Sequence, residues 1–198
     1  MSYIFVGLGN PGEEYENTRH NTGRIMLSFF RKAQNFPEWE EDKKINALVS
    51  EGKVGKEKVM LVLPNTFMNK SGNSLKSLVK SKKAAEHLLV VHDDLDLPLG
   101  RIKMVFNRGM GGHNGLESIK RAVGTEAFIR VKVGISASTS KGVAKKPSGE
   151  KAVIDFILGK LKPAEEAEFK KTGKQVGEAL EILLKEGREK ATGFANSL

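Results

Sequence analysis

Apolar runs recur along the chain and are separated by polar, glycine-rich stretches, a pattern that predicts buried strands ending in loops. The first run, "YIFV", stops at the glycines of "GLGNPG". Two of the later runs are joined across residues 52–56, which is typical of a hairpin. We expect strands at residues 3–6, 45–51, 57–64, 87–91, 101–106 and 128–135.

Between these runs, apolar residues recur at spacings of three and four, which predicts amphipathic helices. Pro163 and Gly187 suit the two ends of the last and longest helix. We expect four helices. The first begins at Thr22, and the second passes through Leu75, Leu78 and Val79. The third runs from Leu116 to about Val123 with Asn114 as its N-cap, and the fourth spans residues 163–187.

Strands that alternate with helices indicate an α/β fold. We expect a single domain over residues 1–198, built as an α/β/α sandwich with a twisted, mixed, largely parallel central sheet. Residues 136–150, "SASTSKGVAKKPSGE", are small, polar and basic without a period. We therefore expect a mobile basic loop there.

Charge and composition narrow the class of protein. A net charge of +9 favours an acidic partner such as a nucleic acid, although many lysine-rich proteins are only well solvated. The absence of cysteine excludes disulfides, thiolate nucleophiles and cysteine zinc sites. No apolar run is long enough to span a membrane, and the strand expected at residue 3 leaves no room for a signal peptide. We expect a cytoplasmic protein without a membrane partner.

Two motifs offer alternatives. "GLGNPG" matches the dinucleotide fingerprint, but no helix opens at its last glycine and Pro11 removes a backbone donor, so we do not expect a nucleotide site. "HDDLD" offers Asp93, Asp94 and Asp96, with a spacing that does not fit a calcium loop. These acids could bind magnesium, could be ordinary loop acids, or could supply one carboxylate that orients a histidine.

The strongest candidate chemistry lies in the polar segments that follow predicted strands. Such segments meet beyond the carboxyl ends of the strands in an α/β sheet, where ligands bind. A neutral imidazole accepts a proton from water near neutral pH, and a carboxylate on its other nitrogen fixes its tautomer. Without a G-x-S-x-G motif, water is the expected nucleophile of a hydrolase. The candidate residues are Asn10, His20, Asn69, Asp93, His113 and Asn114.

Several segments, in order, resemble the bacterial-type peptidyl-tRNA hydrolase family. The resemblance implies a single-domain mixed sheet between helices and hydrolysis of the ester that joins a peptide to the 3′ ribose of tRNA. Such an enzyme recycles tRNA after premature release from the ribosome, and it needs no metal or cofactor; we also expect a monomer. The segments cover about residues 3–162 and read "VGLGNPGEEYENTRHNTG", "PNTFMNKSG", "VVHDDLDLPLG" with the Lys of "RIK", "GGHNGLESI", "RVKVGI" and "FILGKL".

The resemblance also implies roles for matching residues. His20 would be the base that activates water, with Asp93 as its partner. Met68 would line the peptide end of the cleft, and His113 would shape the site. Substrate and water would be positioned by the amides of Asn10, Asn69 and Asn114.

On the tRNA side, the resemblance implies phosphate contacts by Lys103 and Lys132. Family members often carry a second basic residue where this chain has Val105, and often have Arg where Lys132 stands. Lysine cannot make the bidentate contact of arginine, so the phosphate contact would be built differently here. The basic stretch from Lys141 to Lys151 could supply substitute charge or could be a solvated loop.

Two functions of other classes stay open at this point. A non-catalytic RNA-binding module would keep the fold and the basic surface but would not turn over substrate. A magnesium-dependent phosphodiesterase would use Asp93, Asp94 and Asp96. Sensitivity to a chelator separates the second from a metal-independent esterase.

Overall fold

The computed structural model describes residues 2–140 and 142–198, so Lys141 of the predicted basic loop lies outside the described residues. The strands are β1 (Ser2–Gly7), β2 (Glu40–Asp42), β3 (Ala47–Val54), β4 (Glu57–Pro64), β5 (Leu88–Pro98), β6 (Ile102–Phe106), β7 (Ile129–Ser138) and β8 (Ala144–Lys145). The α-helices are α1 (Thr22–Ala33), α2 (Lys82–Ala85), α3 (Asn114–Val123), α4 (Glu150–Leu158), α5 (Pro163–Glu186) and α6 (Arg188–Ser197). The 3-10 helices of the described residues are η1 (Glu13–Tyr15), η2 (Arg19–Asn21) and η3 (Met68–Leu75).

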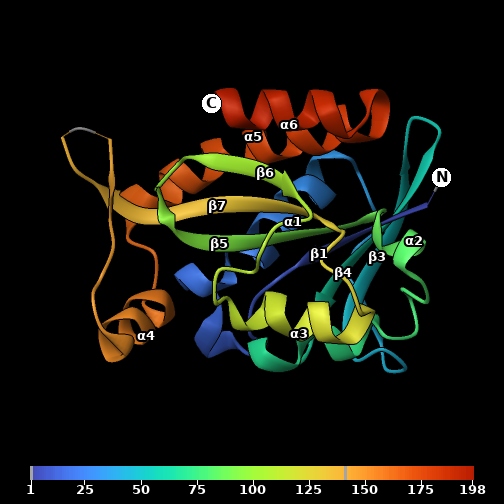
Figure 1. Ribbon diagram of the computed structural model, residues 1–198, viewed down its shortest axis with the longest axis horizontal. Coiled ribbons are helices and arrows are strands. Elements are labelled where there is room, and N and C mark those ends of the chain that lie inside the picture. Colours follow the sequence, from blue (N-terminus) through green and yellow to red (C-terminus); the bar gives the residue numbers. More distant parts are fainter. Residues whose placement is uncertain (1, 141) are drawn as a thin grey trace.

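The described strands form one mixed sheet in the order β2-β3-β4-β1-β5-β7-β6, with β8 paired to β7. Strands β4, β1, β5 and β7 are mutually parallel, and the outer pairs are antiparallel. Figure 1 shows α5 and α6 above the sheet and α3 below it. Helix α1 belongs to the same apolar core as α5 and α6, whereas η3 belongs to that of α3. The predicted α/β/α arrangement is confirmed.

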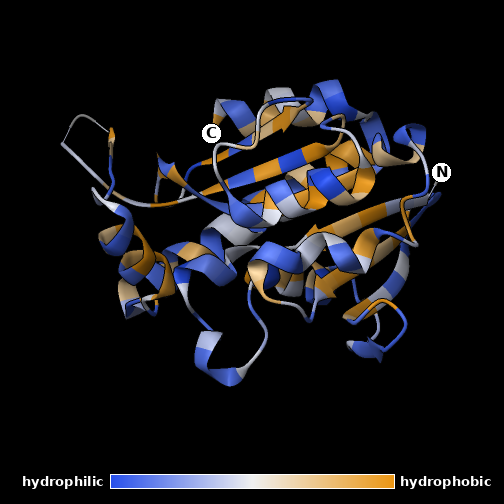
Figure 2. Cartoon of the chain, turned by 60° about the horizontal axis from the view of Figure 1, so that its bottom comes forward, coloured by the Kyte–Doolittle hydropathy of each residue, from blue (hydrophilic) through white to orange (hydrophobic). Residues whose placement is uncertain are grey.

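The central strands are buried on both faces, as their continuous apolar runs predict. Along β1, Phe5 faces the α1 layer and Val6 faces the α3 layer, and Leu89 and Val90 of β5 divide in the same way. Figure 2 shows strands dominated by hydrophobic residues and helices that mix both kinds of residue. The carboxyl ends of β1 and β5 therefore lie between two helical layers, and side chains from both layers can meet there.

The structure has strands at two places where the sequence pattern predicts loops. β5 continues past the apolar run, because His92 and Asp93 pair with Lys132 and Val133 of β7. Residues 136–150 are not a loop throughout, since Ala137 and Ser138 of β7 pair with β8 and Glu150 begins α4. Both errors have one cause: backbone pairing with a neighbouring strand does not require apolar side chains. The expected hairpin is confirmed, with a shorter turn at residues 55–56.

The helices at Thr22 and at Pro163 are confirmed, and Gly187 follows α5 as expected. The helix expected through Leu75 and Val79 was wrong: the chain forms 3-10 helix η3 and then a turn, and both side chains are buried in the core that also holds α3. The N-cap of α3 also differs from the prediction, since His113 and not Asn114 caps the helix by accepting a hydrogen bond from the backbone N–H of Gly115. Helices α2, α4 and α6 and strand β2 were not predicted.

A close approach of α1 to the sheet fixes where the η2 segment lies. A Cβ at Gly23 would collide with the Val91 carbonyl oxygen and the Leu8 nitrogen, and one at Gly7 would lie 2.5 Å from the Gly23 oxygen. The backbone N–H of Leu8 donates to Val91 at 3.0 Å. Because α1 begins against β1 and β5, the residues just before it lie at the carboxyl ends of both strands. Within the described part of the chain, no helix is both long and apolar enough to cross a membrane.

We predict that Gly23→Ala destabilises the protein by about 1–3 kcal/mol, because the added methyl group meets backbone atoms that cannot move aside. The matched control is Gly193→Ala in α6, where a Cβ meets nothing within 4 Å. That change should be neutral or stabilising by up to about 1 kcal/mol. Urea unfolding checks both, and equal midpoints for the two variants would contradict the close approach as the reason for glycine at position 23.

Candidate active site

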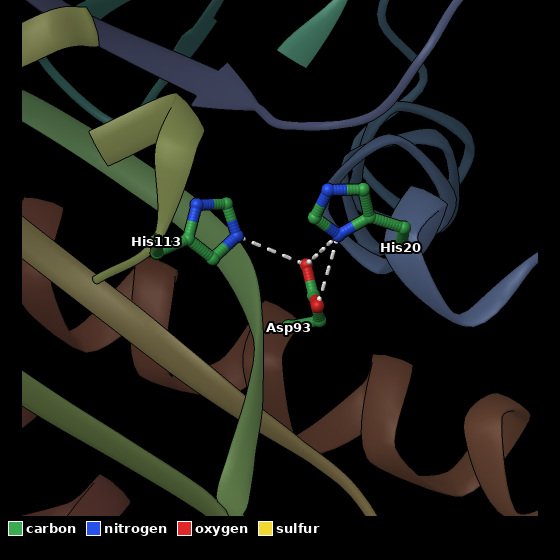
Figure 3. A group of neighbouring side chains, drawn as sticks. All are labelled: His20, Asp93 and His113. Carbon is green, nitrogen blue, oxygen red and sulfur yellow. Dashed lines mark hydrogen bonds and ion pairs between the residues drawn. The ribbon is translucent and has the colours of Figure 1, made fainter. Parts of the chain in front are cut away.

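Three side chains from three parts of the fold meet at one carboxylate. Nδ1 of His20 lies 3.1 Å from both oxygens of Asp93, and Nε2 of His113 lies 3.1 Å from Oδ1. Figure 3 shows the two imidazoles on either side of this carboxylate. His20 lies in η2 before α1, Asp93 lies in β5, and His113 caps α3. The sequence predicted that these segments meet, and the structure places the three residues together.

The hydrogen bonds indicate the proton positions on both rings. An ionised carboxylate only accepts, so Nδ1 of His20 and Nε2 of His113 carry the donated protons. Nδ1 of His113 accepts from the N–H of Gly115 at 3.2 Å, so both of its ring nitrogens are engaged. Nε2 of His20 takes no part in the hydrogen bonds to Asp93, and Figure 3 shows that nitrogen turned away from the carboxylate. His20 is therefore the ring that can accept a further proton.

The environment sets opposite pKa directions for the two partners. Burial alone lowers the pKa of His20, but the charge and hydrogen bond of Asp93 together raise it above its ordinary value. Burial alone raises the pKa of Asp93, but the charges and hydrogen bonds of His20 and His113 hold it well below its usual range. Asp93 therefore stays ionised at neutral pH, and the imidazolium form of His20 is stabilised when it forms.

A pocket of about 500 Å³ opens at this group. His20, Asp93, His113 and Asn114 line it together with the 109–112 loop. The rest of its wall comes from β5 and β7, and from α4 with the chain before it. A pocket of this size accommodates a small-molecule-sized group. The α4 and loop residues are Lys146, Pro147, Glu150, Val153, Ile154 and Ile157.

Of the three predicted amides, Asn10 is buried and hydrogen-bonded, and the other two are exposed. Oδ1 of Asn10 accepts from the backbone N–H of Met68 at 2.9 Å, which ties the loop after β1 to η3. Asn69 and Asn114 are exposed, and only Asn114 lines the pocket with the histidines. Asn21 was missed, although it stands in the "NTRHNTG" segment: its amide exchanges two hydrogen bonds with the backbone of Asn10, at 2.8 and 2.9 Å.

The two lysines expected at tRNA phosphate lie opposite each other on β6 and β7. Lys103 is exposed and has no ion-pair partner among the described residues. Lys132 is half-buried, and its Nζ lies 2.8 Å from Oδ2 of Asp94. Lys103 is therefore more available than Lys132 to bind an anionic partner.

The acids of "HDDLD" do not form one cluster. Asp93 binds the histidines, Asp94 binds Lys132, and Asp96 binds Lys146. Among the described residues, the group that could hold a metal ion is instead His20, Asp93 and His113, whose ligand atoms lie within 4.8 Å of one another. The same atoms already satisfy one another by hydrogen bonds, so an ion is not needed to explain their approach.

Two buried residues that sequence reasoning missed support the pocket wall. His92 donates from Nδ1 to the backbone oxygen of Asp93 at 2.7 Å, and its ring packs edge-on against His113. Burial and the nearby charge of His113 lower the pKa of His92 well below its ordinary value, so it stays neutral. Arg130 donates to the carbonyl oxygens of Arg108 and Gly109 and holds the loop before α3. Neither role is readable from sequence, because both depend on the β5–β7 pairing.

Comparison with known proteins gives consistent matches across the chain. The model of the Peptidyl-tRNA hydrolase family matches residues 4–197. The peptidyl-tRNA hydrolase of Brevibacillus brevis is 36% identical over 196 residues, which is 98% of both chains. That of Mycobacterium tuberculosis strain H37Rv is 37% identical over 189 residues, or 95% of this chain and 94% of the relative. A crystal structure of peptidyl-tRNA hydrolase from Acinetobacter baumannii has a TM-score of 0.87 at 29% identity and covers 98% of this chain and 94% of that one.

We predict that Asp93→Asn lowers the pKa of His20 below its ordinary value of 6.5, because burial remains while the stabilising charge is removed. NMR titration of the imidazole measures this directly. Asp96→Asn is the matched control, since its carboxylate contacts Lys146 and not a histidine. An unchanged His20 pKa in Asp93→Asn would refute the electrostatic account of the pair.

Proposed function

The chain belongs to the peptidyl-tRNA hydrolase family, and we propose that it hydrolyses the ester bond between a peptide and the 3′ ribose of tRNA. The products are free tRNA and a peptide with a free carboxylate. The observation that carries the proposal is the His20–Asp93 pair, which leaves Nε2 of His20 available at the pocket. We further propose that residues 1–198 act as one domain and as a cytoplasmic monomer.

His20 is the general base in this proposal. Its Nε2 takes a proton from water as the water oxygen attacks the ester carbonyl carbon, forming a tetrahedral intermediate. The intermediate collapses by breaking the bond to the ribose oxygen, which receives the proton back from the imidazolium. Asp93 keeps its charge throughout and stabilises the imidazolium, and the proton count balances over the two steps.

The amides and His113 have supporting roles in the proposal. Oδ1 of Asn10 accepts from the backbone N–H of Met68, so the NH₂ group of Asn10 can donate to the carbonyl oxygen of the substrate ester. Negative charge develops on that oxygen in the transition state. Asn114 at the pocket wall would hold substrate and water. Asn69 and Met68 do not line this pocket, so in the proposal they would contact parts of the substrate that extend beyond it, with Met68 on the peptide side. His113 cannot exchange a proton with substrate while both nitrogens are engaged, so it positions Asp93.

We propose that the reaction uses no metal ion and no cofactor. The ligand atoms that could bind an ion are the ones that fix the tautomer of His20, so a metal in their midst would compete with the base. Water activated by His20 supplies the nucleophile without metal assistance. On the tRNA side, Lys103 and Lys132 would contact phosphate, with Lys132 first leaving Asp94.

We expect His20→Ala to lose about 10²–10⁴-fold in activity, the usual contribution of general-base catalysis, while remaining folded. The assay measures hydrolysis of an N-blocked aminoacyl-tRNA with chelator present. The same tRNA carrying an aminoacyl group with a free amino group is the comparison substrate. His87→Ala is the control, because that histidine packs against Tyr3 at the opposite end of β5. Full activity in His20→Ala, or no activity of wild type in chelator, would contradict the proposal.

Lys103→Ala should raise KM and make binding less dependent on salt, with the slope smaller by roughly 0.7–0.9 for each phosphate that this lysine neutralises. The control is Lys174→Ala, an exposed lysine on α5. Measuring KM for full-length substrate between low and high salt tests both variants. If Lys103→Ala keeps the wild-type KM and salt slope, the assignment of this lysine to phosphate is wrong.

A further inference from the structure

Arg19, the residue before His20, has a buried guanidinium held on three sides. The residue is 7% exposed. Nε and Nη2 donate to the two carboxylate oxygens of Glu165 at 2.8–3.3 Å, and Nη1 donates to the backbone oxygen of Phe156 at 3.2 Å. The guanidinium carbon also lies 4.5 Å from the centre of the Phe156 ring. A bidentate contact of this kind fixes orientation as well as position.

The backbone around Arg19 is joined to the same part of the chain. The N–H of Arg19 donates to Gly159 at 3.1 Å, and the N–H of Leu161 donates to Asn17 at 2.8 Å. A Cβ at Gly159 would lie 2.7 Å from Nη1 of Arg19, so the glycine leaves the space that the guanidinium fills. Residues 17–19 are therefore fastened to the link between α4 and α5.

That link connects the base to a wall of the pocket. Helix α4 lines the pocket through Val153, Ile154 and Ile157, and Phe156 belongs to the same helix. Glu165 lies in the first turn of α5, where it also accepts from the backbone N–H of Lys162 at 2.7 Å. Arg19 thus contacts the helix beside the substrate space and the start of the next helix.

We propose that Arg19 is a positioning residue: its contacts with Glu165 and Phe156 hold the backbone of His20 at the distance from Asp93 and α4 that catalysis needs. The inference rests on the proposed role of His20 as base. Arg19 does not touch the carboxylate of Asp93 or the reacting atoms. Its guanidinium points to α4 and α5, so its effect passes through the neighbouring backbone.

The test compares Arg19→Gln with a buried arginine that has similar contacts elsewhere. Arg31 is 4% exposed and donates to Glu38 and to the carbonyl oxygens of Phe36 and Pro37, beyond the far end of α1. Arg31→Gln therefore removes a comparable set of hydrogen bonds without touching the η2 segment. Activity is measured on N-blocked aminoacyl-tRNA at a temperature where circular dichroism shows both variants fully folded.

We expect Arg19→Gln to lower kcat by about 10–100-fold with KM changed less than about threefold, because displacement of a catalytic group by about 1 Å is costly. Arg31→Gln should keep the wild-type kcat. The acid limb of the pH–rate profile of Arg19→Gln should move to lower pH, since a looser contact with Asp93 stabilises the imidazolium less.

A second variant tests the route through Glu165. Glu165→Gln should also lower kcat. In the double variant with Arg19→Gln, kcat should decrease by less than the product of the two single effects, because the two residues share one interaction. Wild-type kcat in Arg19→Gln, an effect on KM alone, an equal decrease in Arg31→Gln, or fully multiplicative single effects would each overturn the inference. His20→Ala, run in parallel, separates failure of the base from failure of its positioning.

Discussion

The site depends on one buried carboxylate that must be paired. Asp93 is 4% exposed, and a charge at such a depth is tolerated only when hydrogen bonds and opposite charge compensate its loss of water. His20 and His113 supply these from opposite helical layers. The same pairing that stabilises the carboxylate fixes the tautomer of His20, so the requirement for stability and the requirement for catalysis are met by the same contacts.

The fold brings these partners together through features remote from the chemistry. Gly23 lets α1 begin in contact with β1 and β5, which brings the η2 segment to the carboxyl end of the sheet. Arg19 then fastens that segment to α4 and α5, and Asn21 fastens it to the loop of Asn10. Helix α3 begins beside β5 with His113 as its cap. The base is thus held by backbone contacts on several sides, and the pocket wall is part of the same framework.

Apolar periodicity was enough to predict the α/β/α class, the helix at Thr22 and the long helix at Pro163, because burial of an apolar face determines those elements. It failed at β5, where Asp93 lies in a strand because β7 supplies the backbone partners. The position of His20 and Asp93 in polar segments after strands brought them into one predicted site, and the family resemblance then assigned their roles, which periodicity alone could not do. The Arg19–Glu165 contact was not predictable, since it joins residues 146 positions apart through a geometry that no local pattern encodes.

The most direct test of His20 as the base is the pH dependence of kcat/KM for an N-blocked aminoacyl-tRNA, which reports ionisations of the free enzyme. The neutral form of His20 is the active one, and Asp93 raises its pKa above 6.5. We expect kcat/KM to rise with pH through one ionisation whose midpoint lies above 6.5 and equals the pKa of His20 measured by NMR. A profile that is flat across this range, or a midpoint that differs from the His20 titration, would contradict the assignment of His20 as the base.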